Sequence, residues 1–211
     1  MLAEHTVFQP VGAGFLLGLG FVFSIGPQNL MLIQSGADRD YPVTVATTGY
    51  LSEILIVTVG AIGLGASLRE LTQLGFVLRL LGIAFLAWYG LHAIIKRHQA
   101  ATSGRQQAPR RSRRRAVRSM LVVTWLNPLV YVEVVFLLGV VASGFGHDRR
   151  WWFTTGFLIA SGLRFYGWSL AGRLLHPWLA EPRRRAQFAV VSGCLLLCSA
   201  GLLTSQIAGW P

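Results

Sequence analysis

The sequence predicts an all-α integral membrane protein with six transmembrane helices, arranged as two inverted three-helix repeats. Three observations support this prediction. Apolar residues make up 53% of the 211-residue chain and charged residues only 13%, a balance too apolar for a soluble domain. Six apolar stretches approach or exceed the roughly 20 residues that cross a bilayer. A proline interrupts the first and the fourth stretch, at equivalent places in the two halves.

The six predicted spans leave little chain for any water-exposed domain. They are residues 7–33, 43–66, 74–95, 117–142, 151–175 and 187–209. Three spans per half is an odd number, so the two halves must cross the membrane in opposite directions. We therefore expect a first repeat over 1–95, a basic cytoplasmic linker over 96–117 and a second repeat over 118–211.

Most of the formal charge of +11 lies in two loops, between spans three and four and between spans five and six. The positive-inside rule places both loops in the cytoplasm, so both termini lie outside it in a bacterial plasma or inner membrane. Anionic lipids are the expected neighbours of these arginines. Binding of nucleic acid is not expected, because the arginine run adjoins a span and has no interleaved aromatic residues.

The first span contains the polar stretch Ser24-Ile25-Gly26-Pro27-Gln28-Asn29. Pro27 lacks a backbone N–H and its ring crowds the carbonyl of Phe23, so a helix here must kink or break. In lipid such a break persists only where it faces protein or a cavity. Earlier in the span, the spacing of Gly14 and Gly18 allows another backbone to approach closely, which is compatible with a homodimer.

The second span carries Ser52-Glu53 close to its centre. A carboxylate at that depth costs at least roughly 2.5–3.5 kcal/mol unless it finds a partner, water or a proton. Glu53 is therefore a candidate site residue. A structural glutamate paired with another helix is the alternative.

The fourth span repeats the proline break of the first and contains Thr124, Asn127, Pro128, Tyr131 and Glu133. In a continuous helix, Thr124, Asn127 and Tyr131 share one face, whereas Glu133 points away from it. If the helix breaks at Pro128, that projection does not apply. The sequence leaves both arrangements open.

The fifth span places Arg164 at mid-depth, where an unpaired arginine would be very costly. Glu53 and Glu133 are the carboxylates at similar depth, and an alignment of the two halves puts Glu53 opposite Arg164. The last span has no buried charge. Its Cys194 and Cys198 lie one helical turn apart, as packing residues do.

With these motifs the chain resembles the LysE family of lysine/arginine exporters. The resemblance rests on the stretch 24–29, on Gln34-x-Gly36, on Ser52-Glu53, on Gly82 to Gly90, and on the run from Thr124 through Glu133 to Gly139. The chain departs from the family in having glutamate where aspartate is usual, at positions 53 and 133, and in Arg164.

The resemblance implies an exporter of arginine or lysine. The inverted halves indicate alternating access, and exchange of a substrate of net charge +1 for an inward proton would cancel the electrical cost of export. Glu53 and Glu133 are the predicted proton carriers, and the half-helix starts after the two prolines would face the substrate carboxylate. The predicted substrate-binding residues are Pro27, Gln28, Asn29, Glu53, Thr124, Asn127, Pro128, Tyr131, Glu133 and Arg164.

Other functions remain open at this point. The chain could export neutral amino acids or another small solute, or serve as a membrane scaffold that transports nothing. A membrane thiol-disulfide enzyme would need cysteines near the two prolines, and there are none. A metal exporter would need His, Cys or Asp clustered at mid-depth, whereas the histidines lie near span ends or in loops. We expect no enzyme activity, no cofactor and no metal site.

Overall fold

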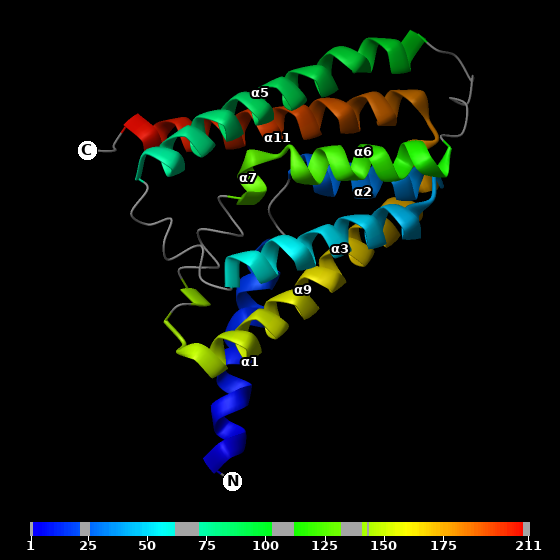
Figure 1. Cartoon of the computed structure of the whole chain (residues 1–211). Coiled ribbons are helices and arrows are strands. Elements are labelled where there is room, and N and C mark those ends of the chain that lie inside the picture. The colour runs from blue at the N-terminus through cyan, green and yellow to red at the C-terminus, as the bar shows by residue number, and fades with distance from the viewer. Residues whose placement is uncertain are drawn as a thin grey trace.

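The computed structural model describes residues 2–21, 26–61, 72–102, 112–131, 141–142 and 144–208. Every regular element in these ranges is a helix, as predicted (Figure 1). The helices are α1 (Leu2–Gly20), α2 (Pro27–Ala37), α3 (Pro42–Val59), α5 (Thr72–Thr102), α6 (Arg113–Trp125), α7 (Pro128–Val130), α9 (His147–Leu174), α10 (His176–Leu179) and α11 (Pro182–Ala208).

Proline marks the start of several of these helices. Pro27, Pro42 and Pro128 each occupy the first position of α2, α3 and α7. Proline suits that position because the first N–H groups of a helix have no partner within it and the ring fixes a helical φ. The residues that break a long apolar run therefore also begin the next helix.

Two of the described helical segments are apolar enough and long enough to cross a bilayer, namely Pro42–Val59 and Arg183–Leu202. Val7–Gly20 and Leu80–Ile95 are shorter apolar segments. Helix covers both ends of the predicted linker 96–117, since α5 continues to Thr102 and α6 begins at Arg113. Lys, Arg, Gln and Ala are good helix formers, so this polar sequence extends the helices instead of ending them.

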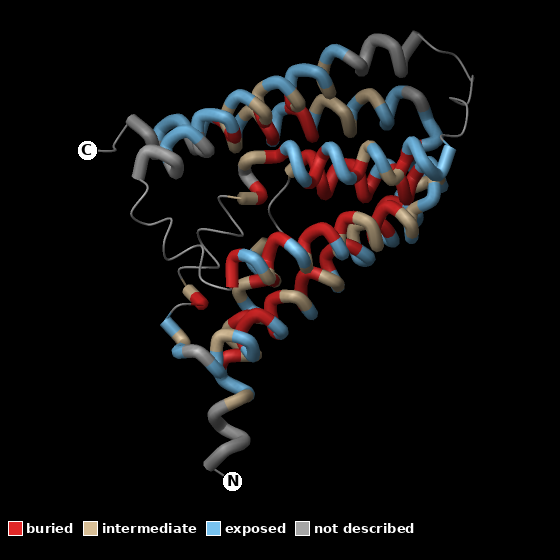
Figure 2. Tube along the Cα trace, viewed as in Figure 1, coloured by how far each residue is buried: buried red, intermediate tan, exposed pale blue. Residues whose placement is uncertain are grey.

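The helices form two groups, and the buried apolar residues that the structure describes form three clusters. In one group α1, α2, α3 and α6 pack around α9 and one another, and in the other α5 lies along α11 (Figure 1). Leu30 of α2 joins them by packing against Leu86 of α5 and Leu196 of α11. Figure 2 shows α2 buried almost throughout, whereas α5 and α11 expose much of their length.

Small residues bring α1 and α2 into backbone contact with α9. A Cβ added at Gly14 would lie 1.9 Å from the carbonyl oxygen of Phe153, and one at Gly36 would lie 2.1 Å from that of Ser169. Gly18 meets Ala160 in the same way. The close approach predicted for Gly14 and Gly18 is thus made within the chain, so these glycines do not supply the dimer contact considered above.

The basic helix ends gather at one end of the bundle. The start of α6, the start of α11 and the end of α9 all lie on the right in Figure 1, whereas the start of α1 and the end of α11 lie away from that end. The arginines there include Arg113, Arg114, Arg173, Arg183 and Arg185. The first residues of α1 and the last residues of α11 therefore lie away from the basic end of the bundle.

Candidate functional site

Both proline-containing spans are broken rather than only kinked. In the first, Gly26 has an extended backbone, with φ of −108° and ψ of 171°, directly before α2 begins at Pro27. In the fourth, α6 ends at Trp125 and α7 begins at Pro128. The choice left open by the sequence is therefore settled at Pro128, and the common face drawn for a continuous helix does not apply.

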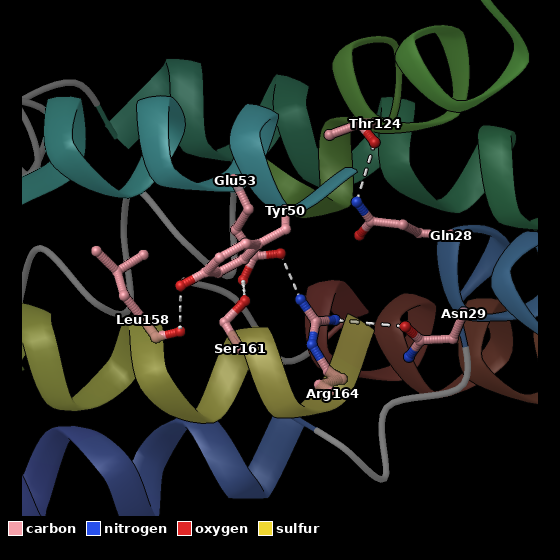
Figure 3. A network of polar contacts seen from close by, with 8 residues as sticks. All are labelled: Gln28, Asn29, Tyr50, Glu53, Thr124, Leu158, Ser161 and Arg164. Atoms are coloured by element: carbon pink, nitrogen blue, oxygen red, sulfur yellow. Dashed lines mark hydrogen bonds and ion pairs between the residues drawn. The ribbon is translucent and has the colours of Figure 1, made fainter. Parts of the chain in front are cut away.

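The two breaks meet inside the protein. Gln28 in the first turn of α2 donates a hydrogen bond from Nε2 to Oγ1 of Thr124 in the last turn of α6, at 2.9 Å (Figure 3). Both side chains are buried, Thr124 completely. Asn127 between α6 and α7 is also buried, as is Pro27, while Pro128 is half-buried. At the second break Asn127 thus faces the interior, whereas the neighbouring Leu126 is 65% exposed.

A buried ion pair lies next to this contact. Glu53 of α3 is 1% exposed, and its Oε2 pairs with Nη2 of Arg164 on α9 (Figure 3). Ser161, one turn earlier on α9, donates a hydrogen bond of 2.6 Å to the other carboxylate oxygen. The pairing predicted for Arg164 with one of the two glutamates is therefore present, and Glu53 is the partner.

The arginine links the ion pair to α2. Its Nη1 lies 3.5 Å from Oδ1 of Asn29, and its guanidinium lies over the ring of Phe165, 4.8 Å from the centroid. Arg164 Nε is buried and has no hydrogen-bond partner among the residues that the structure describes. The guanidinium thus contacts both α2, through Asn29, and α3, through Glu53.

Further polar contacts were not foreseen from the sequence. Trp125 donates from its indole N–H to Oγ of Ser52 at 3.1 Å, tying the end of α6 to the residue before Glu53. Ser161 could have been found, because it lies three residues before Arg164 and shares its helix face. Tyr50 donates to the carbonyl of Leu158 at 3.1 Å, which holds α3 against α9.

Two of the predicted site residues make none of the contacts described so far, one because its hydroxyl bonds elsewhere and one because its structure is not described. Tyr131 turns its hydroxyl back to the carbonyl of Trp125, at 2.8 Å. Glu133 lies outside the described residues. Among the residues that are described, no group of three His, Cys, Asp or Glu side chains could hold a metal ion.

The electrostatics of the cluster follow from its burial. Opposite charges attract far more strongly in a low-dielectric interior than in water, but each charge has also lost its hydration. Glu53 and Arg164 therefore depend on each other, and removing one leaves the other buried and unpaired.

Residues 14–206 match the LysE type translocator family. The chain belongs to this family. It is thus a helical membrane transporter and not an enzyme, in agreement with the resemblance drawn from the motifs.

Individual members of the LysE type translocator family cover nearly the same length. The chain is 35% identical to the arginine exporter protein ArgO of Pectobacterium atrosepticum over 173 residues, which is 81% of this chain and 84% of that protein. It is 32% identical to the arginine exporter protein ArgO of Salmonella newport over 199 residues, which is 92% of this chain and 91% of that protein. No solved structure matches it.

Proposed function

We propose that this chain exports arginine, lysine or both from the bacterial cytoplasm across the inner membrane. Its similarity to two arginine exporters along most of its length supports this proposal. The observation that supports it best is the direct contact of Gln28 with Thr124, which joins the two helix breaks beside the buried pair of Glu53 and Arg164. Broken helices that meet near the bilayer midplane are a common way to build a transport site.

The architecture we propose is that of two inverted repeats, residues 1–95 and 118–211. The helix contacts support it, because α1 packs on α9 as α6 packs on α3, and α5 packs on α11. In the proposed repeat, spans one, two and three correspond to spans four, five and six. Exchanging the two halves therefore turns the contact of spans one and five into the contact of spans four and two, and it leaves the contact of spans three and six unchanged. We further propose that the basic end faces the cytoplasm and that both termini face outward.

The substrate we propose carries two cationic groups and one carboxylate. It would meet Glu53, Glu133 and Arg164. The two carboxylates and the guanidinium together carry one negative charge, which the single net positive charge of the substrate would neutralise. In the structure Arg164 already places a guanidinium on Glu53, the same group that an arginine substrate would present. Glu53 is therefore able to bind such a cation in this setting.

The carboxylate of the substrate would bind at the start of α2. Gly26 precedes this helix and has no side chain to cap it, and the positive end of the helix dipole favours an anion there. Gln28 and Asn127 are buried at the two breaks and supply amide groups on either side. Asn29 and Thr124 complete the polar wall.

Proton entry would drive the export. Moving one positive charge outward against an inside-negative potential costs roughly 2.3 kcal/mol per 100 mV. Exchange for one inward proton cancels that electrical cost and leaves the pH gradient as the drive. Glu53 and Glu133 would carry the proton, since a carboxylate within a span can bind either a proton or a cation.

Transport assays in proteoliposomes test the proposal. Counterflow of labelled arginine, lysine and a neutral amino acid is measured with and without a pH gradient. We expect arginine or lysine to exchange and the gradient to speed efflux. The double variant Glu53→Gln/Glu133→Gln should lose transport while remaining in the membrane, and Glu181→Gln, at an exposed glutamate, should keep it. Normal efflux from the double variant would end the proposal.

A neutral amino acid is the second candidate substrate. It is favoured by one observation: Arg164 and Ser161 already occupy both oxygens of Glu53. In that case Arg164 would remain a structural partner, and a substrate without side-chain charge would bind only at the breaks. Counterflow of the neutral amino acid, with none of arginine or lysine, would decide for it.

A further inference from the structure

A groove runs between α3 and α6, on the outside of the bundle and away from the buried ion pair. Its volume is about 610 Å³. It is lined by Val43, Thr44, Thr47, Thr48, Leu51, Arg113, Arg114, Val117, Arg118 and Leu121. The proposed transport function uses none of these residues.

The groove changes character along its length. At the basic end of the bundle Arg113, Arg114 and Thr44 line it beside Val43. Arg118 lies in its middle, with Thr47, Thr48 and Val117, and Leu51 and Leu121 line its far end. Seven residues separate Thr44 from Leu51, as they do Arg114 from Leu121, which corresponds to about 10 Å of helix. A ligand that fills the groove must therefore be charged at one end and apolar at the other.

The charged end selects an anion. Arg113, Arg114 and Arg118 are exposed, and among the described side chains no carboxylate pairs with any of them. Three positive charges around one groove repel a cationic amino acid, so the groove is not a second substrate site. They are well suited to a phosphate, which accepts strong charge-assisted hydrogen bonds from arginine.

We propose that this groove binds one anionic phospholipid. The phosphate lies among the three arginines at the membrane surface, and an acyl chain runs along Leu51 and Leu121 towards the membrane interior. The lipid then bridges α3 of the first half and α6 of the second. It supports their packing one residue from Ser52, whose hydroxyl accepts the Trp125 hydrogen bond.

Two other occupants fit the groove less well. A second copy of the chain, placed by two-fold symmetry, would bring the same three arginines against each other. A free phosphate would leave the apolar half of the groove uncovered. A phospholipid satisfies both the charge and the apolar surface.

The test is lipid retention by the purified full-length protein in a mild detergent, measured by native mass spectrometry. The probes are phosphatidylglycerol, phosphatidylcholine and sn-glycerol 3-phosphate. The variant R113Q/R114Q/R118Q is compared with R115Q/R173Q/R183Q, which removes the same number of charges from exposed arginines outside the groove. Thermal unfolding checks that both variants fold.

We expect one phosphatidylglycerol to be retained by the unaltered protein and by the control. The groove variant should bind it at least about tenfold more weakly, since the loss of a hydrogen bond to a charged group costs about 1.5–3 kcal/mol and 1.4 kcal/mol is tenfold. Equal loss in the control, or equal retention of phosphatidylcholine, would overturn the proposal. Displacement of phosphatidylglycerol by sn-glycerol 3-phosphate would also overturn it. So would a dimer that forms without lipid and becomes more stable in the R113Q/R114Q/R118Q variant.

Discussion

Ser161 and Arg164 approach Glu53 from the same face of α9 and take one carboxylate oxygen each. The carboxylate is thus held by one neutral and one cationic donor. The two contacts differ in what their loss would do, because a hydroxyl can be replaced by a small apolar group whereas a buried guanidinium needs a counter-charge. The need of the buried guanidinium for a counter-charge gives the first prediction.

Glu53→Gln should destabilise the protein by about 3–5 kcal/mol, because it leaves Arg164 as a buried unpaired cation. The double variant Glu53→Gln/Arg164→Gln should recover most of that loss, since no net charge then stays buried. Thermal or denaturant unfolding in detergent measures both. Recovery of stability with export still absent would separate transport from packing, whereas export by the double variant would mean that the pair is only structural.

Thr124→Val should weaken the link between the two helix breaks. Valine keeps the shape of threonine but leaves the buried amide of Gln28 without its acceptor, at a cost of about 1–3 kcal/mol. Thr155→Val is the matched control, because Thr155 is exposed and its hydroxyl bonds to the carbonyl of Trp151 on its own helix. Unfolding midpoints and initial efflux rates should both fall in the first variant, and equal values in the two would argue against the link.

Gly14→Ala should disrupt the packing of α1 on α9. The new methyl group would collide with the backbone carbonyl of Phe153, and overpacking of this kind costs typically about 1–3 kcal/mol. Gly12→Ala, two residues earlier, meets nothing within 4 Å and should be neutral or mildly stabilising, because alanine favours helix. Thermal stability of the two variants provides the comparison, and a Gly14→Ala protein as stable as Gly12→Ala would contradict this packing.

The ion pair between Asp38 and Arg185 should matter little to stability. It joins the end of α2 to the start of α11, but both side chains are largely in solvent, at 35% and 46% exposure. Exposed pairs contribute about 0–1 kcal/mol and are screened by salt. Arg185→Gln should therefore shift the unfolding midpoint slightly at low salt and not at 0.5 M salt, and a large shift at high salt would be inconsistent with this interpretation.

The sequence was sufficient for the features that follow from covalent chemistry and charge. A proline without an N–H disrupts the helix that precedes it, so the interruptions before Pro27 and Pro128 could be expected from the sequence, although Pro10 lies within α1. A buried arginine requires a counter-charge, so Arg164 could be assigned to one of two glutamates. Small residues at helical spacing predicted a close helix contact in span one.

The contact partners of these side chains and glycines could not be predicted from the sequence. Gln28 and Thr124 are 96 residues apart, and nothing local distinguishes their contact from other amide–hydroxyl pairs. The glycines of span one predicted a close neighbour but not which one, and α9 takes that place. Tyr131 does not share a helix face with Thr124, because α6 ends at Trp125 and the helical periodicity does not continue to residue 131.

The pairing of α1 and α2 with α9 has a consequence for biosynthesis. The helices that contain Gly14 and Gly36 are made early, but the backbone they fit against is made more than 100 residues later. The nascent first half therefore cannot bury its polar break against its final neighbour, and Arg164 reaches the ribosome exit long after Glu53. Native assembly has to wait until α9 leaves the translocon. Chains truncated before α9 should therefore be degraded by the cell.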